Sequence, residues 1–168
     1  MKIRLEKFSY RFADQIINSK LYLRNEIENI LTNHSYDFSS LSRPKFNSLL
    51  DVRFKEHGWE TQPKVFDDDK DPSAKMDFLK DRVGVEVEFG HSSFIGIDLL
   101  KFQVSSYSNL DKIDLGIYVV TTRNFQKRIM SEFGMKWDGS LTFEKVVKYL
   151  PHFKSAIQVP VLVLGLDI

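Results

Sequence analysis

The sequence lacks several features that would each have indicated a class of protein. It contains no cysteine, which excludes disulfide bonds, thiolate zinc sites and cysteine nucleophiles. No apolar run approaches the roughly 18 residues of a membrane-spanning helix. The first residues, 1–7, lack the apolar stretch of a secretory signal. We therefore expect a cytoplasmic protein with no membrane partner.

An excess of charge of one sign is also missing. The chain has 24 basic and 23 acidic side chains, a net charge of +1. A protein that only coats nucleic acid usually carries a much larger positive excess. A nuclease needs carboxylates at its metal site, and these lower the total. Balanced charge therefore argues against a DNA-coating role and leaves a DNA-cutting role open.

The length and the apolar periodicity predict an ordinary globular fold. With 168 residues, 42% of them hydrophobic, we expect a single domain spanning residues 1–168. A strand, a helix and a second strand in succession imply a parallel unit. The predicted fold class is α/β, a central mixed β-sheet flanked by helices. The expected helices span 13–33, 45–57, 94–107, 124–133 and 141–149, and the expected strands span 76–79, 83–89, 112–121 and 159–166.

Between the second predicted helix and the first predicted strand lies a charged segment, residues 61–75, with two prolines and little periodicity. We interpret it as a loop, and a long loop in a compact domain is more often functional or mobile than idle. Its lysines would suit backbone phosphate, although a solvated loop is the plainer interpretation for each of them. These lysines are Lys64, Lys70 and Lys75.

Three acids form the most informative pattern in the chain. Asp77 is followed by eight residues and then by Glu86 and Glu88. Alternation in 83–89 places the two glutamates on one face of a half-buried strand, and a turn at 80–82 allows Asp77 to fold back beside them. Converging carboxylates suit magnesium, which can activate water and stabilise a phosphate under attack. The alternative is that the acids lie on a solvated sheet face and that Asp77 is a turn residue.

The surrounding residues carry a resemblance to a known family. Residues 76–90, from Met-Asp-Phe-Leu-Lys to Val-Glu-Val-Glu-Phe-Gly, resemble the active-site block of the BglII/BstYI restriction endonucleases, members of the PD-(D/E)xK nuclease superfamily. Those enzymes have an aspartate, eight residues and then Glu-Val-Gln-Phe. The likeness continues in 93–94, 98–99 and 111–114, and extends to 57–59, 159–161 and 164–166. It implies a restriction-endonuclease-like core.

The resemblance also implies roles for individual residues. Asp77 and Glu86 match the metal-binding carboxylates of the family, with Mg²⁺ as the implied cofactor. Glu88 matches the third motif position, where the relatives have glutamine and most PD-(D/E)xK nucleases have lysine; glutamate is similar to the BamHI-like arrangement. Glu88 is then either the general base or a further metal ligand. Gln62 matches an amide position near the metal site.

DNA contacts are implied in two regions. The resemblance places base-reading residues at His91, Ser92 and Ser93; the alternative is that one serine caps the next helix and that His91 has no role. Arg123 and Asn124 form a second candidate pair, and Lys75 is a candidate for a phosphate contact. Two further basic residues, Lys80 and Arg82, are either phosphate contacts or ordinary turn charges.

The resemblance therefore predicts a type II restriction endonuclease that hydrolyses double-stranded DNA. The relatives act as homodimers on palindromic sites, so that two-fold protein symmetry matches two-fold site symmetry. Three alternatives remain open. These are a strand-nicking or repair nuclease on the same fold, a DNA-binding module that does not cut, and an α/β domain of unrelated function.

Overall fold

The computed structural model describes residues 2–66, 74–107, 110–137 and 139–168. These residues form one six-stranded sheet in the order β1-β6-β5-β4-β3-β2. Strands β4, β5 and β6 are parallel, whereas β1, β3 and β2 pair antiparallel with their neighbours. The predicted mixed sheet is confirmed. The strands are β1 (Arg4–Tyr10), β2 (Glu60–Thr61), β3 (Phe78–Lys80), β4 (Val83–Val87), β5 (Leu115–Thr121) and β6 (Val161–Asp167).

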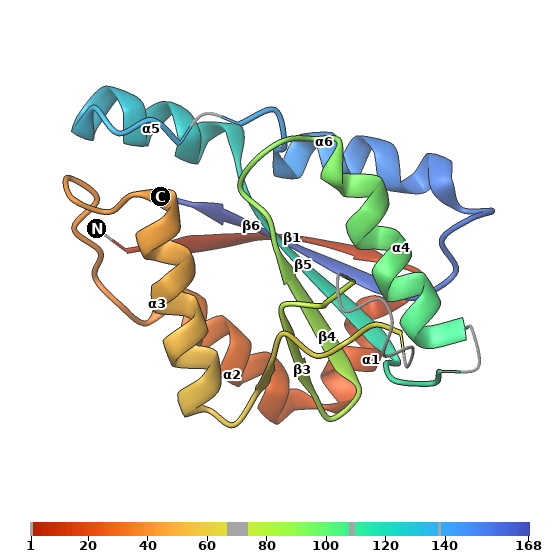
Figure 1. The fold of residues 1–168 in the computed structure, drawn as a ribbon. Coiled ribbons are helices and arrows are strands. Elements are labelled where there is room, and N and C mark those ends of the chain that lie inside the picture. The colour runs from red at the N-terminus through yellow and green to blue at the C-terminus, as the bar shows by residue number, and fades with distance from the viewer. Residues whose placement is uncertain (1, 67–73, 108–109, 138) are drawn as a thin grey trace.

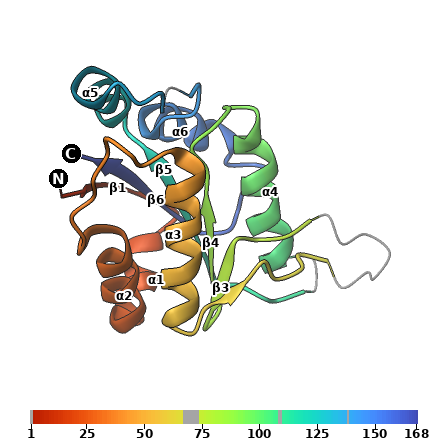
Figure 2. The same ribbon diagram turned by 60° about the vertical axis from the view of Figure 1, so that its left-hand side comes forward.

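Helices cover both faces of this sheet (Figures 1 and 2). Helices α1, α2 and α3 lie on one face, and α4 and α6 lie on the other. Each layer of helices buries its own set of apolar side chains against the sheet. The helices are α1 (Ala13–Ser19), α2 (Leu21–Thr32), α3 (Arg43–Glu56), α4 (Phe94–Tyr107), α5 (Arg123–Phe133) and α6 (Phe143–Tyr149), followed by the 3₁₀ helix η1 (Leu150–Phe153).

Each predicted strand matches an observed one to within about three residues at either end, and so does each predicted helix except one, whereas β1, the two-residue strand β2 and η1 were not predicted. The single helix expected over 13–33 is divided at Lys20, whose φ of −118° and ψ of 51° are not helical. The Lys20 ammonium bonds to the Asp81 carbonyl and to Asp114 Oδ2, so a tertiary contact fixes the break. The strand β1 was not predicted, because it lies at the sheet edge with most of its side chains exposed or half-exposed. Within the described residues, no helix has the length and apolar character that crossing a membrane requires.

Helix α3 and the turn after it position one side of the candidate site. Ser42 caps the helix by accepting a hydrogen bond from Lys45 N. Gly58 adopts a φ of +76° just beyond the helix, a conformation that favours glycine. The following Trp59 packs its ring on Phe54 at 5.2 Å between centroids, as predicted. This fold-back brings the chain to β2, which pairs antiparallel with β3.

The strand β4 is buried on both faces, which corrects one prediction. The sequence pattern suggested a half-buried strand whose polar face, carrying Glu86, contacts solvent. In the structure Val83 and Val85 pack toward α1–α3, and the opposite face is covered by the layer that contains α4. Glu86 is therefore only 3% exposed. A buried carboxylate without a full set of partners is costly, so this position needs a chemical explanation.

Candidate active site

Asp77 lies directly before β3, and two hydrogen bonds fix its carboxylate. Its Oδ2 accepts from Val87 N at 2.8 Å, and its Oδ1 accepts from the Gln62 side-chain amide at 3.1 Å. The first bond ties Asp77 to the end of β4, next to Glu86. The second places Gln62 beside the acid, as the resemblance implied. Antiparallel pairing of β3 with β4 thus brings together residues that are far apart in the motif.

Glu86 projects from β4 toward α4, where it meets Lys101. The Lys101 Nζ atom lies 3.0 Å from Glu86 Oε1 and 3.1 Å from Oε2. The same ammonium lies 3.1 Å from Asp98 Oδ1, one turn earlier on α4. Asp98 Oδ2 in turn accepts a hydrogen bond of 2.9 Å from the Tyr118 hydroxyl on β5. Sequence reasoning gave no role to Asp98, Lys101 or Tyr118, although the i, i+3 spacing of the first two on a predicted helix was a usable signal.

Glu88 follows the last residue of β4 and is half-buried. Its backbone N–H still donates to Val119 O at 3.0 Å, so the chain continues beside β5. Its Oε1 atom accepts a hydrogen bond of 2.5 Å from Gly90 N, which orders the turn toward α4. Glu88 therefore has a structural contact in addition to any role in cleavage.

Burial and mutual repulsion raise the proton affinity of these acids. The pKa of Glu86 is raised to about 9, chiefly by burial and then by the nearby Asp77, while the Lys101 ammonium acts in the opposite direction. Burial also raises the pKa values of Asp77, Glu88 and Asp98 above their ordinary values. Perturbed carboxyl groups gathered in one place are typical of catalytic and ion-binding sites.

The donor set fits a hard divalent cation. Among the residues that the structure describes, no three His, Asp or Glu side chains are arranged to hold a metal ion. Asp77 and Glu86 nevertheless interact electrostatically, and a cation, the Lys101 ammonium, already lies against Glu86. Magnesium is commonly bound by one or two carboxylates, with water and substrate phosphate completing the shell. Two carboxylates are therefore a sufficient protein contribution.

A pocket of about 230 Å³ opens beside Asp77. Gln62, Asp77 and Val87 line it from the strand side, and Asn47 and Asp51 line it from α3. Asp51 adds to the negative charge near Asp77, since its carboxylate raises the pKa of Asp77 slightly further. The pocket gives solvent and ligands access to the Asp77 carboxylate.

The turn between β4 and α4 carries the first group of predicted DNA contacts. His91 is exposed, and its Nδ1 atom lies 2.9 Å from the Ser93 hydroxyl. The Ser92 hydroxyl accepts hydrogen bonds from Ser140 at 3.1 Å and from Lys145 at 3.2 Å. Ser92 thus links this turn to the segment before α6.

The second group lies at the start of α5. Arg123 is exposed, and its backbone N–H donates to the Glu144 carboxylate. The side-chain amide of Asn124 donates to Asp167 Oδ1 at 2.8 Å, so in this structure it binds the C-terminal strand. The chain reaches α5 from the same end of the parallel strands from which it enters the turn with His91.

The remaining basic candidates belong to neither of these two groups: two form contacts within the protein, two lie in the charged segment after β2, and one is outside the described residues. Lys80 bonds to Glu26 Oε1 at 2.8 Å and to the His57 carbonyl, which favours a structural role. Arg82 pairs with Asp114 and Asp111, and this also favours a structural role. Lys75 is exposed and forms an isolated β-bridge with Lys64. Lys70 lies outside the described residues.

Comparison with known proteins agrees with this fold. No curated protein sequence matches the chain. The crystal structure of BglII complexed with a DNA 16-mer is similar with a TM-score of 0.73 and 18% identity, over 100% of this chain and 79% of that one. The structure of free BglII is similar with a TM-score of 0.60 and 20% identity, over 100% and 80%. The family model of the restriction endonucleases BglII and BglIII matches residues 5–166, and the chain therefore belongs to the BglII/BglIII family of restriction endonucleases.

Proposed function

We propose that this chain is a type II restriction endonuclease in which Asp77, Glu86 and Glu88 carry out Mg²⁺-dependent cleavage of double-stranded DNA. The observation that carries the proposal is the hydrogen bond from Val87 N to Asp77 Oδ2, because it brings Asp77 to the strand of Glu86. The family membership supports the reaction class. We further propose that residues 1–168 form a single endonuclease domain and that the enzyme acts in the cytoplasm.

The chemistry follows from the positions of the three acids. Asp77 and Glu86 are the two carboxylates that would hold the ion. A bound Mg²⁺ would supply Lewis-acid stabilisation of the scissile phosphate and a more acidic water. Gln62 orients Asp77 through its amide. Glu88, next to this pair, is the candidate to accept a proton from the attacking water, or to extend the ligand set.

The proposed DNA contacts lie where the parallel strands end. His91 and Arg123 are exposed and extend from chain segments that follow β4 and β5. Base edges are read by side chains in the major groove, while hydroxyl and basic groups also contact phosphate. Their exposure supports the proposal for these two, and Ser92 and Asn124 would have to exchange an internal partner for DNA. The full proposed set is His91, Ser92, Ser93, Arg123, Asn124 and Lys75.

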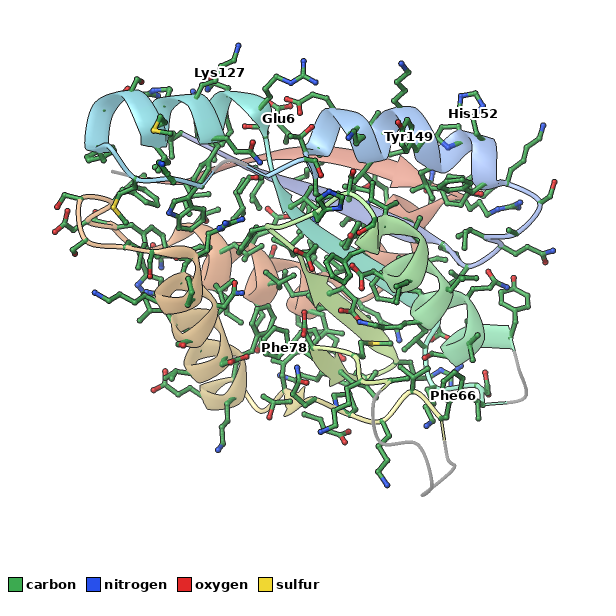
Figure 3. All side chains as sticks on the ribbon, turned by 45° about the horizontal axis from the view of Figure 1, so that its top comes forward. Glu6, Phe66, Phe78, Lys127, Tyr149 and His152 are labelled. Atoms are coloured by element: carbon green, nitrogen blue, oxygen red, sulfur yellow. The ribbon has the colours of Figure 1, made fainter. Side chains whose placement is uncertain are left out.

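The outer face of α4 is a candidate interface for a homodimer. Phe94, Ile97, Leu100 and Tyr107 are spaced by helical turns and are 44%, 55%, 50% and 55% exposed. Figure 3 shows Phe66 near one end of the same helix, which extends the apolar surface. Several exposed apolar side chains on one helix favour a protein interface. We propose that a second copy of the chain packs here, as two-fold recognition of a palindrome requires.

The test is digestion of unmethylated phage DNA with Mg²⁺, compared with an EDTA control. The variants are Asp77→Ala and Glu86→Ala. The matched control is Glu6→Ala, an exposed glutamate on β1 at the opposite edge of the sheet (Figure 3). We expect discrete fragments from the wild type and the control. We expect a loss of at least about 1,000-fold from both site variants, since metal ligands are essential to such catalysis.

Each other outcome has a defined meaning. Cleavage by Asp77→Ala at the wild-type rate would refute the proposed site. Nicked circles in place of linear fragments would indicate a strand-nicking nuclease on the same fold. Sequence-specific binding without cleavage in any divalent metal would indicate a DNA-binding module.

A further inference from the structure

Lys101 occupies an unusual place beside the proposed cleavage site. It lies on α4, on the side that faces β4, and its ammonium contacts both carboxylate oxygens of Glu86 at 3.0 and 3.1 Å. Its side chain retains 21% exposure, whereas that of Glu86 retains 4%. The cation therefore lies between a buried acid and solvent.

A second acid holds Lys101 in this position. Asp98 Oδ1 lies 3.1 Å from the same Nζ atom, and Asp98 Oδ2 accepts from the Tyr118 hydroxyl at 2.9 Å. Asp98 is 4% exposed and Tyr118 is 0% exposed. The contacts form a continuous chain from the central strand β5 through α4 to Glu86 on β4. Each member is fixed by the one before it.

The charges explain why a cation is needed at this point. Four carboxylates, from Asp77, Glu86, Glu88 and Asp98, interact with one another across the site. The third motif position is Glu88, so the motif itself contributes no positive charge. Buried like charges are stable only with a compensating partner. Lys101 provides that partner from a different element of the fold.

We propose that Lys101 is a positioning residue of the cleavage site, holding the Glu86 carboxylate in place while competing with a divalent cation for its oxygens. The proposal rests on the proposed function of Asp77 and Glu86. When a cation binds Glu86, Lys101 gives up contact with at least one carboxylate oxygen. Its bond to Asp98 keeps the ammonium beside the site.

A purely structural ion pair would behave differently. Losing a structural pair would reduce folding stability, metal binding and cleavage together. If Lys101 is a positioning residue, its removal should raise the affinity for a divalent cation and lower kcat. Without the ammonium the acids attract a cation more strongly, while the loss of a fixed Glu86 slows the reaction.

The experiment compares Lys101→Met, Lys101→Arg and the control Lys154→Met, an exposed lysine just after η1. Mn²⁺ binding is measured without DNA, from the electron paramagnetic resonance signal of the free ion. Cleavage is measured in Mg²⁺ as kcat and KM for DNA, and folding by thermal unfolding. Asp98→Asn replaces Lys101→Met in these measurements if Lys101→Met does not fold. It keeps an acceptor for the Tyr118 hydroxyl but removes the negative charge that holds the Lys101 ammonium.

We expect Lys101→Met to bind Mn²⁺ about tenfold more tightly, because a nearby positive charge has been removed. We expect its kcat to fall about 100-fold, as misplacement of a reacting group by 1 Å can do, with KM for DNA little changed. Lys101→Arg should recover most of the cleavage. For Asp98→Asn we expect a drop in kcat of about tenfold with retained Mn²⁺ binding.

Two results would overturn the proposal. One is a kcat for Lys101→Met within about twofold of the wild type, well inside the effects expected of a positioning group. The other is weaker Mn²⁺ binding together with lost cleavage, the pattern of a structural pair. Neither affects the proposed function, which stands or falls on the Mg²⁺-dependent cleavage by the wild type and its loss in Asp77→Ala.

Discussion

The Tyr118 hydroxyl donates a hydrogen bond to Asp98 Oδ2 at 2.9 Å, entirely within the protein. Burial and then the Asp98 carboxylate raise the pKa of Tyr118 above its ordinary value, so the hydroxyl stays protonated and remains a donor. Because Asp98 also contacts Lys101, the central strand β5 is connected to the proposed site by side chains alone. The proposed site is thereby anchored to the middle of the sheet.

Tyr118→Phe should therefore lower stability and slow cleavage to a small extent. The variant leaves Asp98 buried with one partner fewer, and an unpaired buried acceptor costs about 1–3 kcal/mol. We expect that loss in urea unfolding and a decrease in kcat of only a few-fold, because Lys101 still contacts Asp98. Tyr149→Phe, at an exposed position on α6, is the control. Unchanged stability of Tyr118→Phe would contradict the importance of this bond.

Glu86→Gln should increase stability at high pH while abolishing cleavage. The pKa of Glu86 in the folded protein is about 9, above its ordinary value. The folded state thus binds a proton that the unfolded state releases, and wild-type stability should decrease as pH rises toward 9. Glutamine keeps acceptor and shape without the charge, so we expect a gain of about 2 kcal/mol at pH 9.

The measurement is urea unfolding in EDTA at pH 6 and pH 9 for the wild type and Glu86→Gln. The stability difference between the two proteins should increase from pH 6 to pH 9, because the penalty begins near the ordinary pKa of glutamate and grows with pH. A glutamine variant that is equally stable or less stable at pH 9 would show that Glu86 is not a buried, destabilising acid.

Gln62→Leu tests whether the amide orients Asp77. Gln62 donates to Asp77 Oδ1 at 3.1 Å, and its exposed side chain contributes little to the core. Leucine removes the donor, and we expect kcat to fall about tenfold, since groups that orient a metal ligand typically contribute 10- to 100-fold. Thermal unfolding should be nearly unchanged. Cleavage at the wild-type rate would remove Gln62 from the proposed site.

Glu88→Gln addresses the third motif position. The amide oxygen of glutamine can accept the hydrogen bond from Gly90 N that Glu88 accepts at 2.5 Å, so the turn should be preserved. If Glu88 takes the proton from the attacking water, we expect a loss of at least about 100-fold in kcat. Mn²⁺ affinity then stays the same, whereas a parallel loss of Mn²⁺ affinity would identify Glu88 as a ligand.

Ile97→Glu combined with Leu100→Glu tests the proposed dimer face. Both side chains are at least 50% exposed on α4, so the substitutions should not disturb the core. Two like charges from each subunit would meet across a two-fold interface and prevent association. We expect a monomer in analytical ultracentrifugation and a loss of double-strand cleavage. A wild-type protein that is already monomeric with DNA would refute the interface.

The main architecture was predictable because it depends on local patterns. Alternation and apolar spacing gave β4, α4 and β5 in their correct order, and α4 was predicted with its observed bounds. The turn at Gly58 and the packing of Trp59 also follow from neighbouring residues. The spacing of Asp77, Glu86 and Glu88 indicated the candidate site.

The features that could not be predicted depend on contacts between residues that are distant in the sequence. The edge strand β1 exists because β6 pairs with it, and the break at Lys20 exists because of contacts with Asp81 and Asp114. The burial of Glu86 could not be inferred from a strand pattern, since α4 supplies the cover. The same is true of Lys101, which follows Glu86 by 15 positions in the chain but touches it in the fold.

The position of β6 has a consequence for how the protein folds. This strand comes last in the sequence, yet it lies between β5 and β1 and pairs with both. Strand β1 can therefore pair only after β6 has formed. Because these two strands are far apart in the sequence, their pairing has a high contact order and is expected to form slowly. Until β6 is in place, β5 presents an open edge of main-chain donors and acceptors. Before β6 pairs, the sheet is incomplete and its open edge can pair with other chains. A chaperone that protects this edge would favour productive folding over aggregation.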